Sequence, residues 1–115
     1  MTMAHPDPPL APAAFLILFA LASGEKHGYA IMQEARKLSD HTLQMGPATL
    51  YTTIQRLLDA GRIEEVPGPE HGDSRRKYYR LNASGKTALK AELARMEAMV
   101  KKSKAMRPRL AESSS

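Results

Sequence analysis

Residues 45–58, with the sequence MGPATLYTTIQRLL, decide the fold of this chain. Pro47 suits the first turn of a helix, where its missing N–H costs no hydrogen bond. Apolar side chains then recur at i, i+4, i+7 and i+8, which makes one stripe along a helix: Leu50, Ile54, Leu57 and Leu58. The pattern predicts an amphipathic helix that packs this stripe against a core.

The opposite face of this predicted helix carries small or hydrogen-bonding side chains and no acid before Asp59. Its members are Ala48, Thr49, Thr52, Thr53 and Arg56. Small side chains allow close approach to a DNA groove, threonine can contact a thymine methyl group, and arginine can donate two hydrogen bonds to guanine. An ordinary amphipathic helix fits this segment equally well, so the rest of the sequence has to decide between the two interpretations.

Composition narrows the class of protein. The chain has 115 residues, which fits one domain, and its net charge of +5 favours an anionic partner such as nucleic acid or an acidic membrane. Cysteine is absent, which excludes disulfides and is compatible with a reducing cytoplasm. The four histidines, at positions 5, 27, 41 and 71, lack metal-ligand spacing, so neither a metal nor a cofactor is expected.

Residues 10–22 form the one long apolar run. A bilayer-spanning helix needs about 20 apolar residues, and no Lys or Arg precedes the run as in a signal peptide. The run therefore predicts a buried helix over about residues 11–22. It is apolar nearly all round, so a partner chain could cover part of it, including Phe15 and Phe19. Residues 1–9, with three prolines, are expected to form a flexible arm.

Further elements flank the first segment. A second helix is expected over about residues 28–38, with Tyr29, Ile31, Met32 and Ala35 on its inner face. Residues 39–45 predict a polar linker with one brief strand near 42–44. Residues 62–66 and 75–81 predict two antiparallel strands around a loop rich in Pro and Gly. The returning strand begins with Arg75, Arg76 and Lys77.

A last helix is expected to begin at a cap formed by Asn82 or Ser84 and to run to about residue 105, with Pro108 marking its end. Its apolar residues recur at the 4-3-4 spacing of a coiled-coil seam: Leu89, Leu93, Met96 and Val100. The seam predicts a partner helix and therefore a dimer. Residues 107–115 turn basic and then Ser-rich, and we expect them to be disordered.

Together these elements predict a mainly α protein with a small β-hairpin (α+β), a winged helix-turn-helix over residues 10–82 followed by a C-terminal dimerisation helix over 83–106. The helix over 47–60 would enter the major groove. The hairpin would be a wing whose Arg75, Arg76 and Lys77 contact phosphates. The other interpretation of these three charges is a solvated end of a strand.

Four motifs in this order resemble the PadR-type transcriptional regulators: HGY at 27–29, GPATLY at 46–51, RLLDAGRIE at 56–64 and RRKYYRLNASG at 75–85. The resemblance covers about residues 12–100. It implies a winged-helix homodimer, usually a repressor, with dimer contacts from the first and last helices. Ala48 precedes Thr49 here, and Thr52 stands where the family frequently has proline. The base preference therefore cannot be carried over from relatives.

The resemblance also implies individual roles. Tyr29 and Tyr51 would lie near the DNA backbone, the other interpretation being a core ring with its hydroxyl at the surface. Some family members bind flat apolar compounds at the dimer interface. The last helix here offers Met96 and Met99 and no aromatic residue. A pocket for a small apolar effector and a plain dimer core therefore both remain open.

A function from another class is a protein-interaction adaptor that uses the winged-helix fold without specific DNA binding. An enzyme is not expected, because the sequence offers no nucleophile–base pair, metal cluster or phosphate-binding loop. We therefore expect a cytoplasmic, DNA-binding transcriptional regulator, most simply a homodimeric repressor of a palindromic operator. Its expected partners are double-stranded DNA, a second copy of the chain and a small apolar effector, and no membrane.

Overall fold

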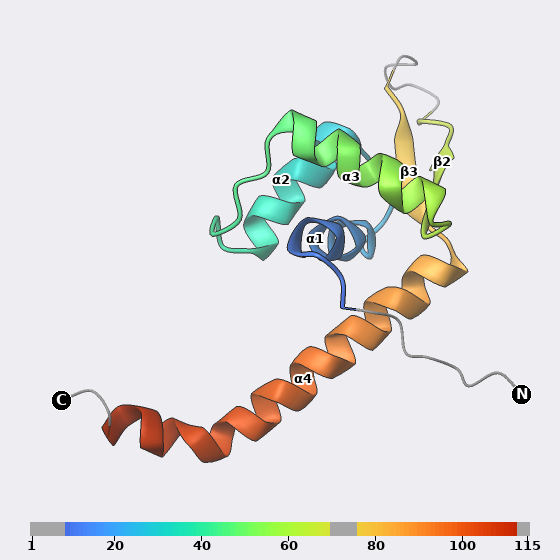
Figure 1. Cartoon of the computed structure of the whole chain (residues 1–115). Helices are drawn as coiled ribbons and strands as arrows, with labels where there is room; N and C mark the ends of the chain where they lie inside the picture. Colours follow the sequence, from blue (N-terminus) through green and yellow to red (C-terminus); the bar gives the residue numbers. More distant parts are fainter. Residues whose placement is uncertain (1–8, 70–75, 113–115) are drawn as a thin grey trace, which may run out of the picture.

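The computed structural model describes residues 9–69 and 76–112. Its elements are α1 (Pro12–Leu21), β1 (Lys26–His27), α2 (Gly28–Leu38), α3 (Pro47–Asp59), β2 (Ile63–Val66), β3 (Tyr78–Leu81) and α4 (Ala83–Glu112). Helix α1 lies in the middle of the molecule and contacts α2, α3 and α4 (Figure 1). The order of these helices and strands along the chain is that of the predicted winged helix-turn-helix, followed by a long last helix.

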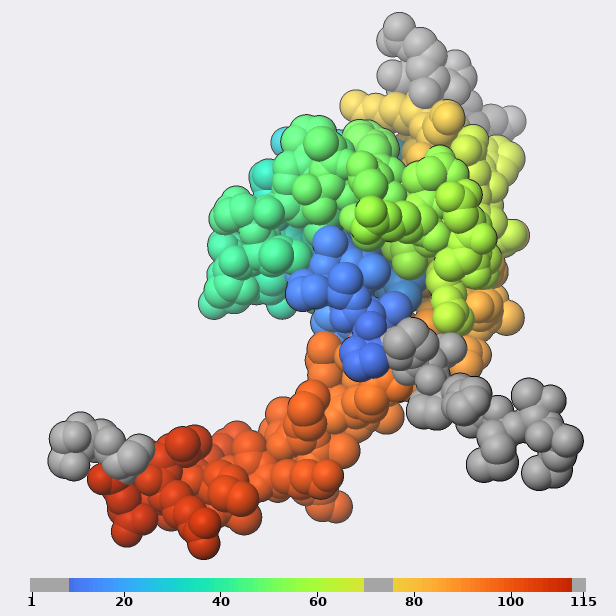
Figure 2. Space-filling model, viewed as in Figure 1, coloured from blue at the N-terminus to red at the C-terminus, as the bar shows by residue number. Residues whose placement is uncertain are grey.

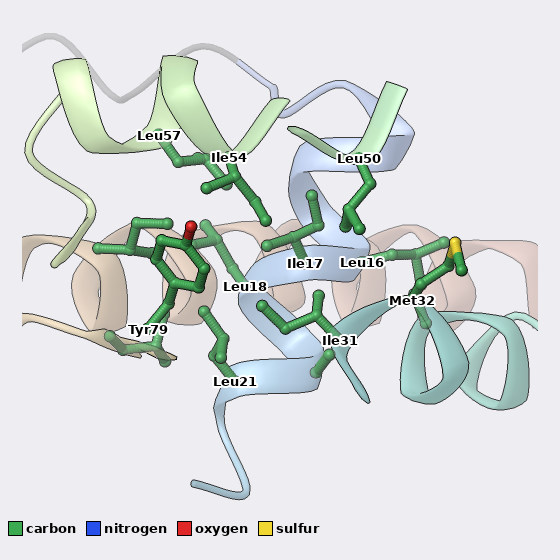
Figure 3. Packing of buried hydrophobic residues seen from close by; sticks show 14 of the residues in the cluster. Leu16, Ile17, Leu18, Leu21, Ile31, Met32, Leu50, Ile54, Leu57 and Tyr79 are labelled. Atoms are coloured by element: carbon green, nitrogen blue, oxygen red, sulfur yellow. The ribbon is translucent and has the colours of Figure 1, made fainter. Parts of the chain in front are cut away.

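The core forms around α1, where Ile17 and Leu18 have no exposed surface. Helix α2 packs Ile31, Met32 and Ala35 against it. Helix α3 adds Leu50, Ile54 and Leu57 (Figure 3). Leu58 packs half-buried against this core, so the predicted stripe is confirmed. Each large aliphatic side chain buried in this way contributes about 1.5–3 kcal/mol. The packing fixes which face of α3 points outward.

Tyr29 was expected on the inner face of α2, and this prediction was wrong. Its side chain is 56% exposed, whereas Ile31 and Ala35 are fully buried. With about 100° between successive helical residues, Tyr29 lies far from the face that Ile31 and Ala35 share. Its hydroxyl therefore points to the surface at the start of α2.

The sheet has three antiparallel strands in the order β1-β3-β2. The predicted hairpin is present as β2 and β3, with Ile63 opposite Leu81 and Val66 opposite Tyr78. Strand β1, which was not predicted, pairs with β3 through Lys26 and Tyr79. A strand of two residues has no alternation that a sequence pattern could reveal.

The strand expected near residues 42–44 is not there. The chain turns at Asp40 and His41, which both have positive φ (52° and 61°). Thr42 Oγ1 then donates a hydrogen bond to the carbonyl of Ser39, and Gln44 Nε2 donates to the carbonyl of His41. These local bonds hold a compact turn between α2 and α3 in place of an extended strand.

Asn82 joins the end of α3 to the start of α4. Its Oδ1 accepts a hydrogen bond from the Gly85 N–H at 2.9 Å, so Asn82 caps α4. Its Nδ2 donates to the Gly61 carbonyl at 2.7 Å. Gly61 follows α3 with a φ of 72°, the left-handed conformation in which glycine ends many helices. One side chain thus fixes both helix ends.

Helix α4 continues through Pro108 to Glu112, so the expected helix end and the expected disorder over residues 107–112 were wrong. Residues 104–112 are all exposed, so a bend can relieve the clash of the proline ring without loss of packing. The axis of α4 changes direction in its last turns (Figure 1).

The second half of α4 projects away from the rest of the molecule (Figure 2). The radius of gyration is therefore 17.1 Å, against about 13 Å for a compact domain of about this length. Within the described ranges, no helix combines the length and the apolar character that crossing a membrane requires.

Candidate nucleic-acid interface

The outer face of α3 gathers the residues that the sequence singled out. Ala48, Thr49, Thr52 and Arg56 are exposed, and Thr53 is half-buried. Together they line a shallow hollow of about 280 Å³. The one acid of this helix, Asp59, lies at its end and accepts a hydrogen bond from Gln55 Nε2 at 2.9 Å. Among the described residues, the lining of the hollow therefore carries no carboxylate and offers hydroxyl, methyl and guanidinium groups.

Thr53 differs from the other threonines of this face. Its hydroxyl donates a hydrogen bond to the Thr49 carbonyl one turn earlier, at 2.7 Å. The proton is thus engaged within the helix, and only the lone pairs of this oxygen remain for a ligand.

The ring of Tyr51 lies against the start of α2. A Cβ atom on Gly28 would stand 2.6 Å from the Tyr51 hydroxyl and 3.0 Å from a ring carbon. The absence of a side chain at Gly28 therefore lets the ring take this position. Tyr51 is 53% exposed, as Tyr29 is at 56%, so the core-ring interpretation is wrong for both tyrosines.

The basic residues of the predicted wing lie just before β3. Arg76 and Lys77 are exposed, whereas Arg75 falls outside the described residues. Arg76 Nη1 stands 3.0 Å from His27 Nε2. The next arginine along the strand, Arg80, is used within the sheet instead, through an ion pair with Glu64 at 2.6 Å.

A cleft of about 540 Å³ joins the wing to α3. Of the predicted residues that the structure describes, three line this cleft: Tyr51, Arg76 and Lys77. No functional role was predicted for the other described residues that line it, which are His27, Gly28, Ile54, Gln55, Leu58, Glu65 and Tyr79. The HGY motif was the one available signal, and it pointed to Tyr29, which lines neither this cleft nor the hollow on α3.

Tyr79 closes the inner side of this cleft and is 4% exposed. Burial raises the pKa of its phenol, and the charges of Glu65 and Tyr51 raise it further. The hydroxyl therefore keeps its proton at neutral pH and can donate it to an acceptor. Among residues 9–69 and 76–112, no three His, Asp or Glu side chains gather into a metal-binding group.

The expected dimer residues divide into two sets. Leu89 is 5% exposed and belongs to the core of its own chain, against which Leu93 packs half-buried. Phe15 and Phe19 are also half-buried, with their ring centroids 5.6 Å apart. Val100, by contrast, is 51% exposed. An open groove of about 410 Å³ runs along α4, lined by Leu93, Met96, Glu97, Val100, Lys101 and Lys104.

Comparisons with known sequences identify a family and relatives of the chain. A family model described as the Transcriptional regulator PadR-like family matches residues 17–91. Uncharacterized protein X of Lysinibacillus sphaericus is 36% identical over 86 residues, which cover 75% of this chain and 78% of that protein. An uncharacterized 37.1 kDa protein in transposon TN4556 of Streptomyces fradiae is 34% identical over 80 residues, which cover 70% of this chain and 21% of that protein.

Solved structures agree with this placement. A transcriptional regulator from Clostridium thermocellum is 29% identical, with a TM-score of 0.64 over 77% of this chain and 84% of that one. The Bacillus subtilis PadR in complex with operator DNA is 26% identical, with a TM-score of 0.64 over 75% of this chain and 48% of that one. The match of the family model to most of the chain, on a fold shared with these regulators, shows that the chain belongs to the PadR-like family of transcriptional regulators.

Proposed function

We propose that the protein is a sequence-specific, DNA-binding transcriptional regulator that acts as a homodimeric repressor. The observation that carries this proposal is the outer face of α3. It exposes Ala48, Thr49, Thr52 and Arg56 without a carboxylate, beside a cleft with Arg76 and Lys77 on its rim. A face of this chemistry fits the major groove, where arginine and threonine read base edges.

The groups around α3 suit contacts to the DNA backbone. Lys77 and Arg76 bring positive charge to the wing, and the exposed hydroxyls of Tyr29 and Tyr51 can donate to phosphate oxygens. Such contacts set the position of α3 on the duplex and carry little sequence information. The similarity to a PadR that was solved with operator DNA supports the same mode of binding here.

The exposed apolar side of α4 supports a homodimer. Met99, Val100, Met106 and Leu110 are each more than half exposed, which is costly for a chain that stays alone in water. A second copy of α4 in the groove lined by Leu93, Met96 and Val100 would cover part of this surface. A two-fold symmetric dimer carries two copies of α3, so a palindromic operator is expected, with half-sites about one or two helical turns apart.

Repression and its release form the last part of the proposal. A dimer bound across a promoter would block transcription, as the resemblance to the mostly repressing PadR-type proteins implies. A small apolar ligand that enters the groove beside Met96 and Val100 would change how two α4 helices pack and would thereby release the operator. In this role the protein would work in the cytoplasm, at the nucleoid.

The test is selection of bound duplexes from a random DNA pool with the full chain, followed by titration of the enriched sequence at several salt concentrations. We expect one palindromic sequence to emerge. Its affinity should fall about a thousandfold or more between about 50 and 200 mM salt, because each phosphate contact releases counterions.

Failure to enrich any sequence, or an affinity that ignores salt, would rule out the groove-binding function. That result would favour the protein-interaction adaptor, for which reversal of the charges at Arg76 and Lys77 should leave the function intact.

A further inference from the structure

The cleft between α3, the start of α2 and the wing combines an apolar floor with a polar rim. Ile54 and Leu58 of α3 form the floor. His27, Arg76 and Lys77 lie along the rim, where the cleft opens beside Tyr51. The wing and α3 therefore converge on one recess next to the face proposed to read DNA.

Each ring nitrogen of His27 lies within hydrogen-bond distance of an N–H donor, and a neutral imidazole can accept from only one of them. Its Nδ1 accepts a hydrogen bond from the Ala30 N–H at 3.2 Å, which caps α2. Its Nε2 stands 3.0 Å from Nη1 of Arg76, which carries only N–H donors. A neutral imidazole accepts at one nitrogen only, so while Nδ1 accepts from Ala30, Nε2 carries a proton that points at another donor. An oxygen placed between His27 and Arg76 could accept from both groups.

The charges around this ring favour an anionic acceptor. Among the described residues, the titratable and charged groups that face His27 or share its cleft are Arg76, Lys77, Tyr78 and Tyr79 from the wing, Tyr51 from α3 and Glu65 from β2. Of the described lining residues, Glu65 opposes an anion, whereas Arg76 and Lys77 offer N–H donors and positive charge to one. Lys26, beside His27 in the chain, donates to Ser23 Oγ at 2.7 Å and is not among the residues that line the cleft.

We propose that this cleft holds a phosphate group, with His27 Nε2 and the Arg76 guanidinium donating to its oxygens. The inference rests on the proposed function, because the phosphate source that lies nearest to the α3 face is the backbone of bound DNA. A DNA phosphodiester bound in the cleft would contact His27 at the start of α2, in addition to its contacts with the wing. Free phosphate ions offer the same chemistry and are the second source to be tested.

Such a contact makes DNA binding depend on pH. Burial and the nearby Arg76 hold the pKa of His27 below its ordinary 6.5 in the free protein. A bound phosphate favours the imidazolium and raises this pKa. The added proton goes to Nδ1, which then no longer accepts from the Ala30 N–H, so the loss of this cap opposes part of the rise. Binding then takes up a proton, so the affinity should rise as the pH falls from about 8 to about 6, by at most about tenfold per pH unit for each protomer.

The first arm of the test compares His27→Asn with wild type in DNA titrations across this pH range. Asparagine keeps an acceptor that can cap α2 through the Ala30 N–H but has no donor at the position of Nε2. We expect about tenfold weaker binding and a flat pH profile. The matched control is His41→Asn, because His41 is exposed and its φ of 61° suits asparagine. This control should keep the wild-type profile.

The second arm needs no variant and no DNA. The pKa of the His27 ring is followed by NMR in the wild-type protein with and without sulfate, which keeps its double charge from pH 6 to 8 and stands in for phosphate. A raised pKa supports an anion site between His27 and Arg76.

The two arms separate the outcomes. A raised pKa with sulfate, together with a flat DNA profile for His27→Asn, supports the site with DNA as its source. A raised pKa alone supports the site with a free anion as its source. If sulfate leaves the pKa unchanged and His27→Asn binds DNA with the wild-type profile, the phosphate site is overturned while the proposed function stands. If wild type binds no DNA, the proposed function fails and the sulfate result alone decides on the site.

Discussion

The carboxylate of Glu92 on α4 accepts a hydrogen bond from the backbone N–H of Leu10, 82 positions earlier in the chain, at 2.9 Å. The same oxygen accepts from Arg95 Nη2 at 2.7 Å. Glu92 is only 6% exposed, so these bonds are shielded from water. They tie the segment before α1 to α4, the helix proposed to form the dimer.

Replacement of Glu92 by alanine should lower the free energy of unfolding by about 1–3 kcal/mol, because the Leu10 N–H and the Arg95 guanidinium lose a shielded acceptor. Chemical denaturation followed by circular dichroism measures the change. Lys90→Ala is the control, since Lys90 is exposed on the same helix outside the groove of α4 and has nearly the same helix propensity as glutamate. Equal losses for the two variants would show that the bonds of Glu92 contribute nothing specific.

The stability contributed by Glu92 should also depend on pH. The Leu10 N–H, and after it Arg95, hold the pKa of Glu92 below its ordinary 4.5. A carboxyl whose pKa is lowered on folding stabilises the protein fully above its unfolded-state pKa, and this contribution is lost as the pH falls through the folded-state value. The difference between wild type and Glu92→Ala should therefore be largest near neutral pH and shrink below about pH 4.5. A constant difference down to pH 3 would contradict this origin.

Local chemistry explains what the sequence could predict. The stripe of Leu50, Ile54 and Leu57 and the cap at Asn82 depend on neighbours within one or two helical turns, and the structure confirms both. The outward face of α3 follows from the stripe by geometry alone. For the same reason, the residues that line the hollow from Ala48 to Arg56 could be named from the sequence.

Contacts between distant segments could not be predicted in this way. The cleft brings His27, Tyr51, Glu65 and Arg76 together from separate elements, and no spacing along the chain encodes their meeting. Strand β1 exists because β3 pairs with it, not because two residues prefer to be extended. The helix beyond Pro108 was missed because a proline rule cannot tell whether a bend would disturb packing.

Gly28→Ala should weaken DNA binding of every sequence by several-fold without unfolding the protein. The added Cβ would collide with the Tyr51 hydroxyl, which is the far end of a side chain that can move away. Displacement of Tyr51 removes its contact to the backbone but leaves the core untouched. Fluorescence anisotropy with the selected DNA measures the loss, and thermal melting checks the fold.

A double variant isolates the cause of this effect. Once Tyr51 is replaced by alanine, the Cβ at position 28 meets no ring. Gly28→Ala/Tyr51→Ala should therefore bind no more weakly than Tyr51→Ala alone. Additive losses would place the effect of Gly28 elsewhere.

Val100→Asp should convert the proposed dimer to monomers in size-exclusion chromatography with light scattering. Val100 is 51% exposed within its own chain, so the substitution changes the stability of the monomer little. At a helix–helix interface the same substitution would bury two unpaired charges, one from each copy, and should weaken association by at least about a hundredfold. This position tests the interface more cleanly than Leu93, which also packs on its own core.

Ala98→Asp provides the matched control for the dimer. Ala98 is exposed, and two residues along a helix place it about 200° from Val100, on the opposite side of α4. This variant should remain dimeric. If Val100→Asp also remains dimeric, the groove lined by Met96 and Val100 is not the interface.

Arg56 and Lys77 should affect DNA binding in different ways. Arg56 lies in the hollow on α3, so Arg56→Ala should alter the preference at one or two base pairs by about 1–3 kcal/mol. Lys77 lies on the wing, so Lys77→Ala should weaken all sequences about equally and lower the salt slope by about 1 for each protomer. Selection from a random pool measures the first effect, and titration at several salt concentrations measures the second.

Lys90→Ala on α4 loses the same charge at an exposed position away from α3 and should change neither the base preference nor the salt slope. If Lys77→Ala alters the base preference while Arg56→Ala weakens all sequences equally, the wing reads the DNA and α3 only contacts its backbone.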